Sequence, residues 1–299
     1  MHRNMKRHIL AVLLIVLAGF GSGCDSKSFN SITHSIDSTQ PAPRPITPFE
    51  PGIDPASKTI RLILPQTQGA EYYNELVETA LINAGYRVDI RLTPNEPQTR
   101  VIADLDNGSV SLYYMLQSAE RDAKYPSIKV NLTNGLIGSR ILFIRKGTQS
   151  RFDGLLSPKD FRDRHLIGAI GANWFDGKVW KANNLLYVGI TGDWKLIYGM
   201  LKAGDRGIDY FPRGANEIWD EYAAHPELDI EKNLILKYDR DFHVYLGKNS
   251  PALKPVLESA LQKAQADGTI NRLVQKHYAK QLNLIQYDNR KVINLNTPE

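Results

Sequence analysis

The sequence predicts an α/β protein built from two similar lobes. Residues 59–92 follow the pattern strand, helix, strand, which is typical of a β-α-β unit. A helix, a turn marked by glycine and a short strand then occur twice, at 101–114 and at 195–211. This repetition favours two lobes of similar build over one long sheet.

The β-α-β unit follows from local apolar spacing. Ile60 to Leu64 is a short apolar run suited to a buried strand, and apolar residues at helical spacing continue from Tyr73 to Ala84, where Gly85 ends the helix. Val88, Ile90 and Leu92 alternate with polar residues and predict the second strand. We expect the two strands to be parallel, with a right-handed crossover.

The remaining expected elements rest on the same signals. Asn107-Gly108 and Ala203-Gly204 each end a helix, and a short apolar run follows each of them. From residue 283 onward no apolar period is visible, so 283–299 is expected to be a polar tail. The expected helices lie at 101–106, 195–202, 251–266 and 269–278, and the expected strands at 110–114, 166–170 and 208–211.

Residues 1–23 have the features of a leader peptide. Three basic residues precede an apolar run at 9–20, and the small residues 21–23 then lead to Cys24, the single cysteine of the chain. About 12 residues of helix rise roughly 18 Å, too short for the ~30 Å hydrocarbon core of a bilayer. The order predicts a leader that is removed, which places the mature chain in the periplasm.

Cys24 is the expected site of a lipid anchor. Its position resembles the signals of bacterial lipoproteins, although Gly21 stands where those signals place leucine or a similar residue. The alternative is an ordinary secretory leader, in which Cys24 has no such role. An aspartate in the place of Asp25 resembles the signal for retention on the inner membrane. Residues 24–57 are rich in Ser, Thr and Pro and predict an extended tether that holds the folded body away from the membrane.

Composition argues against several classes of function. The chain has 37 Lys and Arg against 32 Asp and Glu, and three of the basic residues fall in the leader, so no nucleic-acid partner is expected. A single cysteine allows no internal disulfide and no thiolate metal cluster. The seven histidines lack zinc spacing, and no hydrolase, phosphate-loop or dinucleotide motif occurs. We therefore expect no metal, no cofactor and no enzymatic activity, and we expect a monomer.

Several short blocks, in this order along the chain, carry a resemblance to a known family. They are 105–108 before a strand, 118–121 after it, 141–147 as a crossover strand, 201–204 leading to 208–209, and 266–269 between the closing helices. Together they resemble the type II periplasmic solute-binding proteins, in family 3, whose members bind amino acids and related small polar solutes. The resemblance implies two lobes joined by two crossover hinge strands, with solute in the cleft between them. The first lobe would be 58–145 plus 243–282, the second 148–240, and 283–299 a C-terminal tail.

Three further blocks resemble a little-characterised branch of that family. They are Gly135–Arg140, Gly171–Asp176 and Tyr210–Ile218, and the third contains the run Phe-Pro-Arg-Gly-Ala-Asn-Glu at 211–217. The branch has no settled ligand, so this resemblance narrows the fold more than the function.

Three arginines are candidates for holding an anionic ligand. Arg121 matches the arginine that grips a ligand carboxylate in relatives, because a guanidinium offers a planar fork that fits a carboxylate. Arg140 begins a buried strand near the expected cleft floor, and Arg213 precedes a helix start, where free N–H groups favour an anion. Each has a structural alternative. Arg121 can pair with a neighbouring carboxylate, Arg140 can form an internal salt bridge that braces the hinge, and Arg213 can pair with Glu217.

Asn173, Trp174 and Asp176 follow an expected strand, where relatives use backbone N–H groups for the ligand. Asp176 is interpreted first as a helix N-cap. Trp174 is either a wall of the cleft or ordinary packing, and the sequence leaves both open.

Amino-acid binders of the family carry an aspartate for the ligand ammonium a few residues after the position of Asp209. This chain has Arg213-Gly214 there instead. The hypothesis is therefore a carboxylate or other anion as ligand, unless Asp176, Glu217 or Asp193 supplies the missing negative charge.

The expected function is a periplasmic solute-binding protein that closes on a small polar, carboxylate-bearing ligand and delivers it to an ABC permease. The alternative is a receptor that reports the ligand to a membrane sensor or another envelope partner. A structural envelope protein without ligand is a third reading. An enzyme that uses a carboxylate pair such as Asp176 and Glu217 is a lesser one.

Overall fold

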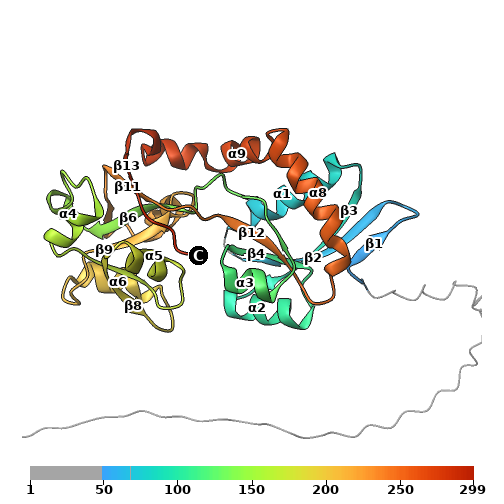
Figure 1. Ribbon diagram of the computed structural model, residues 1–299, viewed down its shortest axis with the longest axis horizontal. Coiled ribbons are helices and arrows are strands. Elements are labelled where there is room, and N and C mark those ends of the chain that lie inside the picture. The colour runs from blue at the N-terminus through green and yellow to red at the C-terminus, as the bar shows by residue number, and fades with distance from the viewer. Residues whose placement is uncertain (1–48, 68) are drawn as a thin grey trace, which may run out of the picture. The chain divides into compact units, whose positions relative to one another are not determined.

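The computed structural model describes residues 49–67 and 69–299 as three β-sheets with flanking helices (Figure 1). The leader, Cys24 and the tether up to residue 48 lie outside the described residues. Two three-stranded sheets make the first lobe, and one seven-stranded sheet makes the second. No helix within the described ranges is long and apolar enough to cross a membrane.

The first sheet contains the predicted β-α-β unit. Strands β2 (Thr59–Gln66) and β3 (Arg87–Asn95) are parallel, with Ile60 opposite Val88, and helix α1 (Ala70–Asn83) connects them. This part of the prediction is confirmed. Strand β1 (Gly52–Asp54) pairs antiparallel with β2, so the end of the range expected to be a tether is a strand.

The second sheet completes the first lobe. Its central strand β12 (Phe242–Leu246) is antiparallel to both β4 (Leu112–Leu116) and β5 (Ser127–Ile128). Helix α2 (Gln98–Asn107) ends at Gly108, whose φ of 86° is accessible to glycine at little cost. Helix α3 (Ala119–Lys124) follows β4, and the hydroxyl of Ser118 caps it.

The seven-stranded sheet forms the second lobe. Its strand order is β13, β11, β6, β9, β7, β8, with β10 paired to β6. The strands are β6 (Ser139–Arg145), β7 (Ile167–Gly171), β8 (Leu186–Ile190), β9 (Tyr210–Gly214), β10 (Leu228–Ile230), β11 (Leu234–Lys237) and β13 (Lys291–Asn294). The helices of this lobe are α4 (Pro158–Asp163), α5 (Asp176–Ala182), α6 (Leu196–Ala203) and α7 (Ile218–Ala224), with a short 3₁₀ helix, η1 (Gln149–Arg151).

The border between the lobes lies earlier in the chain than expected. The sequence analysis assigns 139–145 to the first lobe and interprets 141–147 as a crossover strand. In the structure β6 pairs with β9, β10 and β11, so it is a central strand of the second lobe. The chain therefore crosses between the sheets at 129–138 and returns at 238–241, and neither crossing is a strand.

The C-terminal residues are not a polar tail. After η2 (Pro251–Leu253), the expected helices are present as α8 (Lys254–Ala266) and α9 (Thr269–Leu284). Helix α9 packs on α1 and α8 and also touches α7 of the second lobe, and it runs along the top of Figure 1. The chain then passes through η3 (Tyr287–Asn289) into β13, which lies parallel to β11 at the edge of the large sheet. The prediction for 283–299 is wrong because this segment has few apolar residues: β13 buries only Ile293, and Leu295 is buried just after the strand ends.

A buried aspartate ties the two crossings together. The carboxylate of Asp241 accepts hydrogen bonds from the backbone N–H of Thr133 at 3.0 Å and of Gly135 at 2.7 Å, and from the Thr133 hydroxyl at 2.8 Å. Burial nevertheless raises the pKa of Asp241, and these hydrogen bonds only partly offset that effect.

His243, two residues further on in β12, makes stability depend on pH. Its Nε2 lies 3.3 Å from Asn131 Oδ1, and burial lowers its pKa below the ordinary value of 6.5, with Lys129 and Arg240 contributing and Asp122 opposing. The unfolded chain therefore takes up the proton at a higher pH than the folded one, and this stabilisation is present above pH 6.5 and lost as pH falls below it. We expect the urea concentration at the unfolding midpoint to decrease as the pH falls below 6.5. In the His243→Gln variant this decrease should be smaller. The exposed control His165→Asn should follow the wild type, and a curve unchanged by His243→Gln would contradict the assignment.

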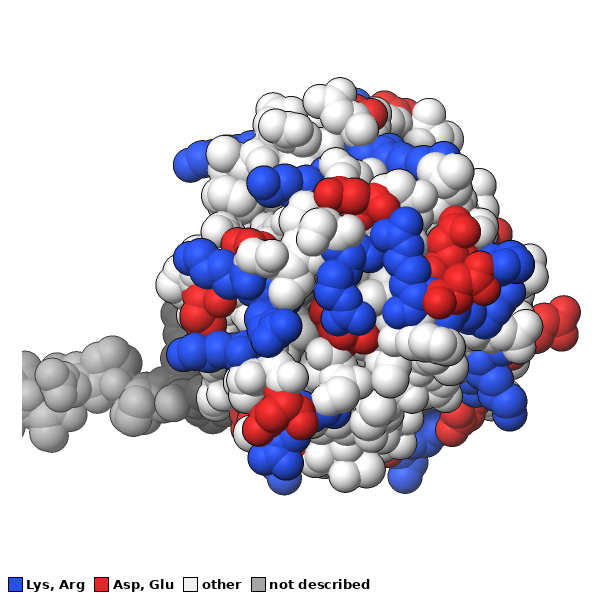
Figure 2. Space-filling view, turned by 90° about the vertical axis from the view of Figure 1, so that its left-hand side faces the viewer, with Lys and Arg blue, Asp and Glu red and all other residues white. Residues whose placement is uncertain are grey.

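Charged side chains of both signs are interspersed on the face drawn in Figure 2. A nucleic-acid surface would need Lys and Arg gathered on one face. The face seen there does not have that arrangement.

Candidate functional site

Two buried arginines lie on neighbouring strands of the second lobe. Arg140 on β6 is opposite Gly214, and Arg213 on β9 is opposite Ile141, so the antiparallel register brings the two guanidiniums to one end of the sheet. Arg140 is 4% exposed and Arg213 is 6% exposed. Charges at this depth need partners, because an isolated ion loses its hydration without compensation.

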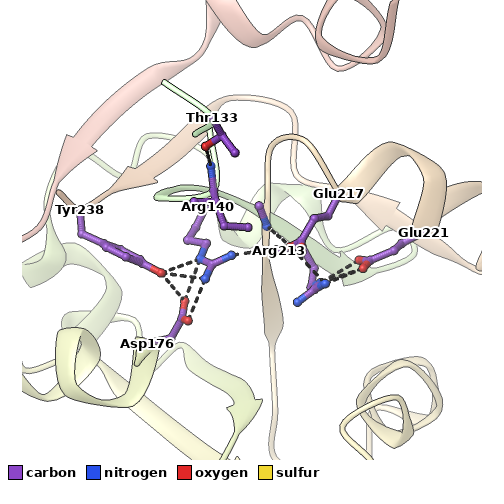
Figure 3. Close-up of polar contacts among 9 residues, drawn as sticks. Thr133, Arg140, Asp176, Arg213, Glu217, Glu221 and Tyr238 are labelled. Atoms are coloured by element: carbon purple, nitrogen blue, oxygen red, sulfur yellow. Dashed lines mark hydrogen bonds and ion pairs between the residues drawn. The ribbon is translucent and has the colours of Figure 1, made fainter. Parts of the chain in front are cut away.

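Arg140 is held by Asp176 and Tyr238 (Figure 3). Its Nε lies 2.8 Å from Asp176 Oδ1, and its Nη2 donates to Asp176 Oδ2 at 2.8 Å and to the Tyr238 hydroxyl at 2.7 Å. Burial acts against the charged guanidinium, but the combined effect of Asp176, Tyr238 and Glu217 exceeds it and raises the pKa of Arg140. Of the two interpretations of Arg140, the internal salt bridge is the one that these contacts form.

Asp176 is therefore not a helix N-cap. It is the first residue of α5, the cap position is Phe175, and the Asp176 side chain makes no capping hydrogen bond. Its carboxylate points at Arg140 instead and is 1% exposed.

Arg213 is held by Glu221 and by aromatic rings. Its Nε donates to Glu221 Oε2 at 2.8 Å and its Nη2 donates to Glu221 Oε1 at 2.6 Å, which is a forked arrangement of two charge-assisted bonds. The guanidinium carbon lies 5.0 Å from the ring centre of Trp174 and 4.7 Å from that of Trp194, within range of cation–π attraction. The ring of Trp174 therefore packs against the guanidinium of Arg213.

Glu217 links the two arginines. Its Oε2 lies 3.1 Å from Arg213 Nη2 and 3.8 Å from Arg140 Nη1, and it accepts a hydrogen bond from the backbone N–H of Gly214 at 3.1 Å. With Asp176 and Glu221 this makes three carboxylates against two guanidiniums, a formal charge of minus one. The Glu217 side chain is 27% exposed, whereas both arginine side chains are nearly covered. The part of this cluster open to solvent is thus negative.

Gly214 has no room for a side chain. An ideal Cβ there would lie 2.8 Å from Asn216 Oδ1 and 3.0 Å from Glu217 Oε2. The space that a side chain at 214 would enter is shared by the side chains of Asn216, Ile137 and Glu217.

Arg121, on α3 of the first lobe, is the one candidate arginine that lies apart from this cluster. It is partly exposed, and its Nη1 donates to the backbone carbonyl of Leu116. Within the described part of the chain it forms no ion pair, and its neighbour Asp122 instead accepts hydrogen bonds from Gln117 and Tyr245. Its guanidinium therefore retains donors for a ligand.

Buried polar groups without partners lie near Glu217 and were missed by the sequence analysis. The hydroxyl of Tyr73 and the Oδ1 of Asn216 have no hydrogen-bond partner among the described residues. Tyr73 stacks on Tyr114 with ring centres 4.2 Å apart. Burial raises the pKa of Tyr73, and Tyr278 and the carboxylate of Glu217 add to the rise.

Asn173 is exposed in the turn between β7 and α5, and no side-chain hydrogen bond of Asn173 occurs among the described residues. Two hollows of the surface lie elsewhere. One of about 350 Å³ is formed by the two crossings and the end of β13, with Asn131, Lys237, Arg240 and Asn294 among its lining residues. The other, of about 230 Å³, lies between α9 and η3. None of the seven expected ligand residues lines either hollow.

Comparisons with known proteins identify the fold. No protein-family model and no curated protein matches the chain. Two solved structures each align with a TM-score of 0.50: an ancestral arginine-binding protein bound to glutamine, at 13% identity over 73% of this chain and 97% of that one, and an amino-acid ABC transporter substrate-binding protein of Streptococcus pneumoniae bound to L-arginine, at 17% identity over 74% and 95%. The fold is that of the two-lobed periplasmic binding proteins. Identities this low show the periplasmic-binding fold and leave the ligand to be argued from the residues.

Proposed function

We propose that this protein is a receptor of the bacterial cell envelope that binds a small polar solute carrying both a carboxylate and an ammonium group. Arg121 of the first lobe would hold the carboxylate, and Glu217 of the second would hold the ammonium. The position of Glu217 is the observation that carries the proposal. Relatives are expected to have an ammonium-binding aspartate near Gly214, and here the Glu217 carboxylate lies beside that glycine and accepts a hydrogen bond from its backbone N–H at 3.1 Å.

This proposal revises the hypothesis of a purely anionic ligand. Two of the three arginines on which that hypothesis depended are neutralised by Asp176, Glu217 and Glu221. A carboxylate brought to this wall would meet the partly exposed Glu217, which would repel it. An ammonium group would instead restore charge balance.

In this scheme the ligand drives closure of the lobes through contacts that exist only in the closed form. A ligand that touches Arg121 and Glu217 together does so only when the lobes are closed, and this difference in contacts favours the closed form. The unpartnered groups of Tyr73 and Asn216 would gain polar partners at the same time.

We further propose that the receptor is held at the inner membrane through Cys24 and serves uptake by an ABC permease. The support is the leader pattern together with the fold shared with the Streptococcus pneumoniae transporter component. A sensor partner in place of a permease would need the same site.

Ligand-dependent melting tests the proposal. Protein unfolded and refolded to remove bound solute should be screened against α-amino acids, monoamines, polyamines and dicarboxylates. A ligand at 100 times its dissociation constant adds about 2.7 kcal/mol of stability, which is visible as a raised melting temperature. We expect a hit among the α-amino acids.

Arg121→Ala and Glu217→Gln should each weaken that ligand at least tenfold, or about 1.4 kcal/mol. The exposed controls Arg100→Ala and Glu78→Gln should bind as the wild type does. Dicarboxylate binding that survives Glu217→Gln would refute the ammonium seat. No shift with any class would refute the receptor.

A further inference from the structure

The edge strand β8 of the second lobe has an unusual composition for its position. Strand β8 is the last strand in the sheet order and, among the described residues, pairs only with β7. Residues 185–192 contain no charged residue and no proline. Natural proteins usually protect such an edge with charges, prolines or a covering element, because its free N–H and C=O groups can recruit another strand.

The apolar side chains of β8 are also open to solvent. Leu186 is 40% exposed, Tyr187 38% and Val188 41%. Helix α5 packs on β8, whereas the main contacts of α6 are with β6, β9 and β10. In Figure 1 β8 lies at the lower margin of its lobe.

The hydrogen bonds to β7 fix which backbone groups are free. The carbonyl of Ile190 accepts a bond from Ala172 N–H at 2.9 Å on the β7 side. Since backbone groups alternate along a strand, Leu186 and Val188 also point toward β7, whereas the N–H and C=O of Tyr187 and Gly189 point to the open edge.

We propose that β8 is the interface of a homodimer, in which β8 of two copies pair antiparallel about a two-fold axis through Val188. In this register Tyr187 of each copy forms the hydrogen-bonded pair with Gly189 of the other, so the outward groups of both are satisfied. The register also complements side chains. Tyr187 would cover the partner's Gly189, and Leu186 would face the partner's Ile190 on the other face of the sheet.

A second copy fits this edge better than a charged partner. The strand offers no charge to attract one, and self-pairing places no like charges opposite each other between residues 185 and 191. The proposal departs from the monomer expected from the sequence and is independent of the ligand.

Sedimentation over a hundredfold range of concentration tests the interface. The wild type is expected to shift from monomer to dimer. Val188→Lys, which sets two lysines opposite each other on the axis, should raise the dimer dissociation constant at least tenfold, about 1.4 kcal/mol. Leu156→Lys is the matched control, because Leu156 is an exposed apolar residue at 59% that lies outside β8. Melting curves of both variants verify that they fold.

Crosslinking locates the axis. On a Cys24→Ser background, Val188→Cys should form a disulfide-linked dimer on oxidation, since residues opposite each other in a non-hydrogen-bonded pair are close enough to bridge. Leu156→Cys should not. A monomer at every concentration, or a dimer that Val188→Lys leaves intact, would overturn the proposal.

Discussion

Deleting residues 290–299 is expected to abolish stable folding. The deletion removes Arg290, which is 8% exposed and whose Nη1 lies 3.7 Å from the buried carboxylate of Glu231. Loss of one partner of a buried ion pair costs about 3–5 kcal/mol. Removal of the buried Ile293 and Leu295 adds about 2–5 kcal/mol each. The sum reaches the whole stability of a typical domain, about 5–15 kcal/mol.

Circular dichroism and urea unfolding of the purified protein would measure this effect. Arg290→Ala alone should lower the free energy of unfolding by about 3 kcal/mol or more, because Glu231 then stays buried without its cation. Lys291→Ala is the matched control, since Lys291 is exposed and its side chain makes no ion pair within the described ranges. A truncated protein that melts cooperatively near the wild-type temperature would show that β13 is dispensable.

The second large effect is expected at the Arg140–Asp176 pair. Asp176→Ala leaves the guanidinium of Arg140 at 4% exposure with only Tyr238 and the more distant Glu217 as polar partners. We expect a loss of about 3–5 kcal/mol in the free energy of unfolding. Asp163→Ala, which breaks an exposed pair with Lys159, should cost less than about 1 kcal/mol.

A double variant separates pairing from packing. Arg140→Met combined with Asp176→Leu removes both charges and should be less destabilised than Asp176→Ala, because no ion is left buried alone. A loss below about 1 kcal/mol for Asp176→Ala would mean that Arg140 finds solvent or another carboxylate.

Local patterns were sufficient for much of the fold. The spacing of apolar residues in 59–92 gave the β-α-β unit, and the closing helices were found by the same periodicity. The border at β6 was misplaced because a buried strand looks the same whichever sheet it joins. Strand β13 was missed because a short edge strand with one buried face carries only two or three apolar residues.

The candidate site was also predictable only in part. Residue type and order pointed to Arg140, Asp176, Arg213 and Glu217, and the structure brings these four into one cluster. Their charge balance was not visible in the sequence, since Glu221 had no reason to stand out from other helical glutamates until it met Arg213 on β9.

The sequence by itself determined the two-lobed α/β fold and the set of charged residues near its centre, because apolar periodicity and glycine-marked turns act over a few residues. Only the tertiary structure decided which of those charges remain available. Ion pairs such as Arg140 with Asp176 join segments 36 residues apart, and whether an arginine binds a ligand or a neighbour depends on which carboxylate the fold places within reach. That selection leaves Arg121 free of an ion pair among the described residues and leaves Glu217 as the partly exposed carboxylate of the cluster.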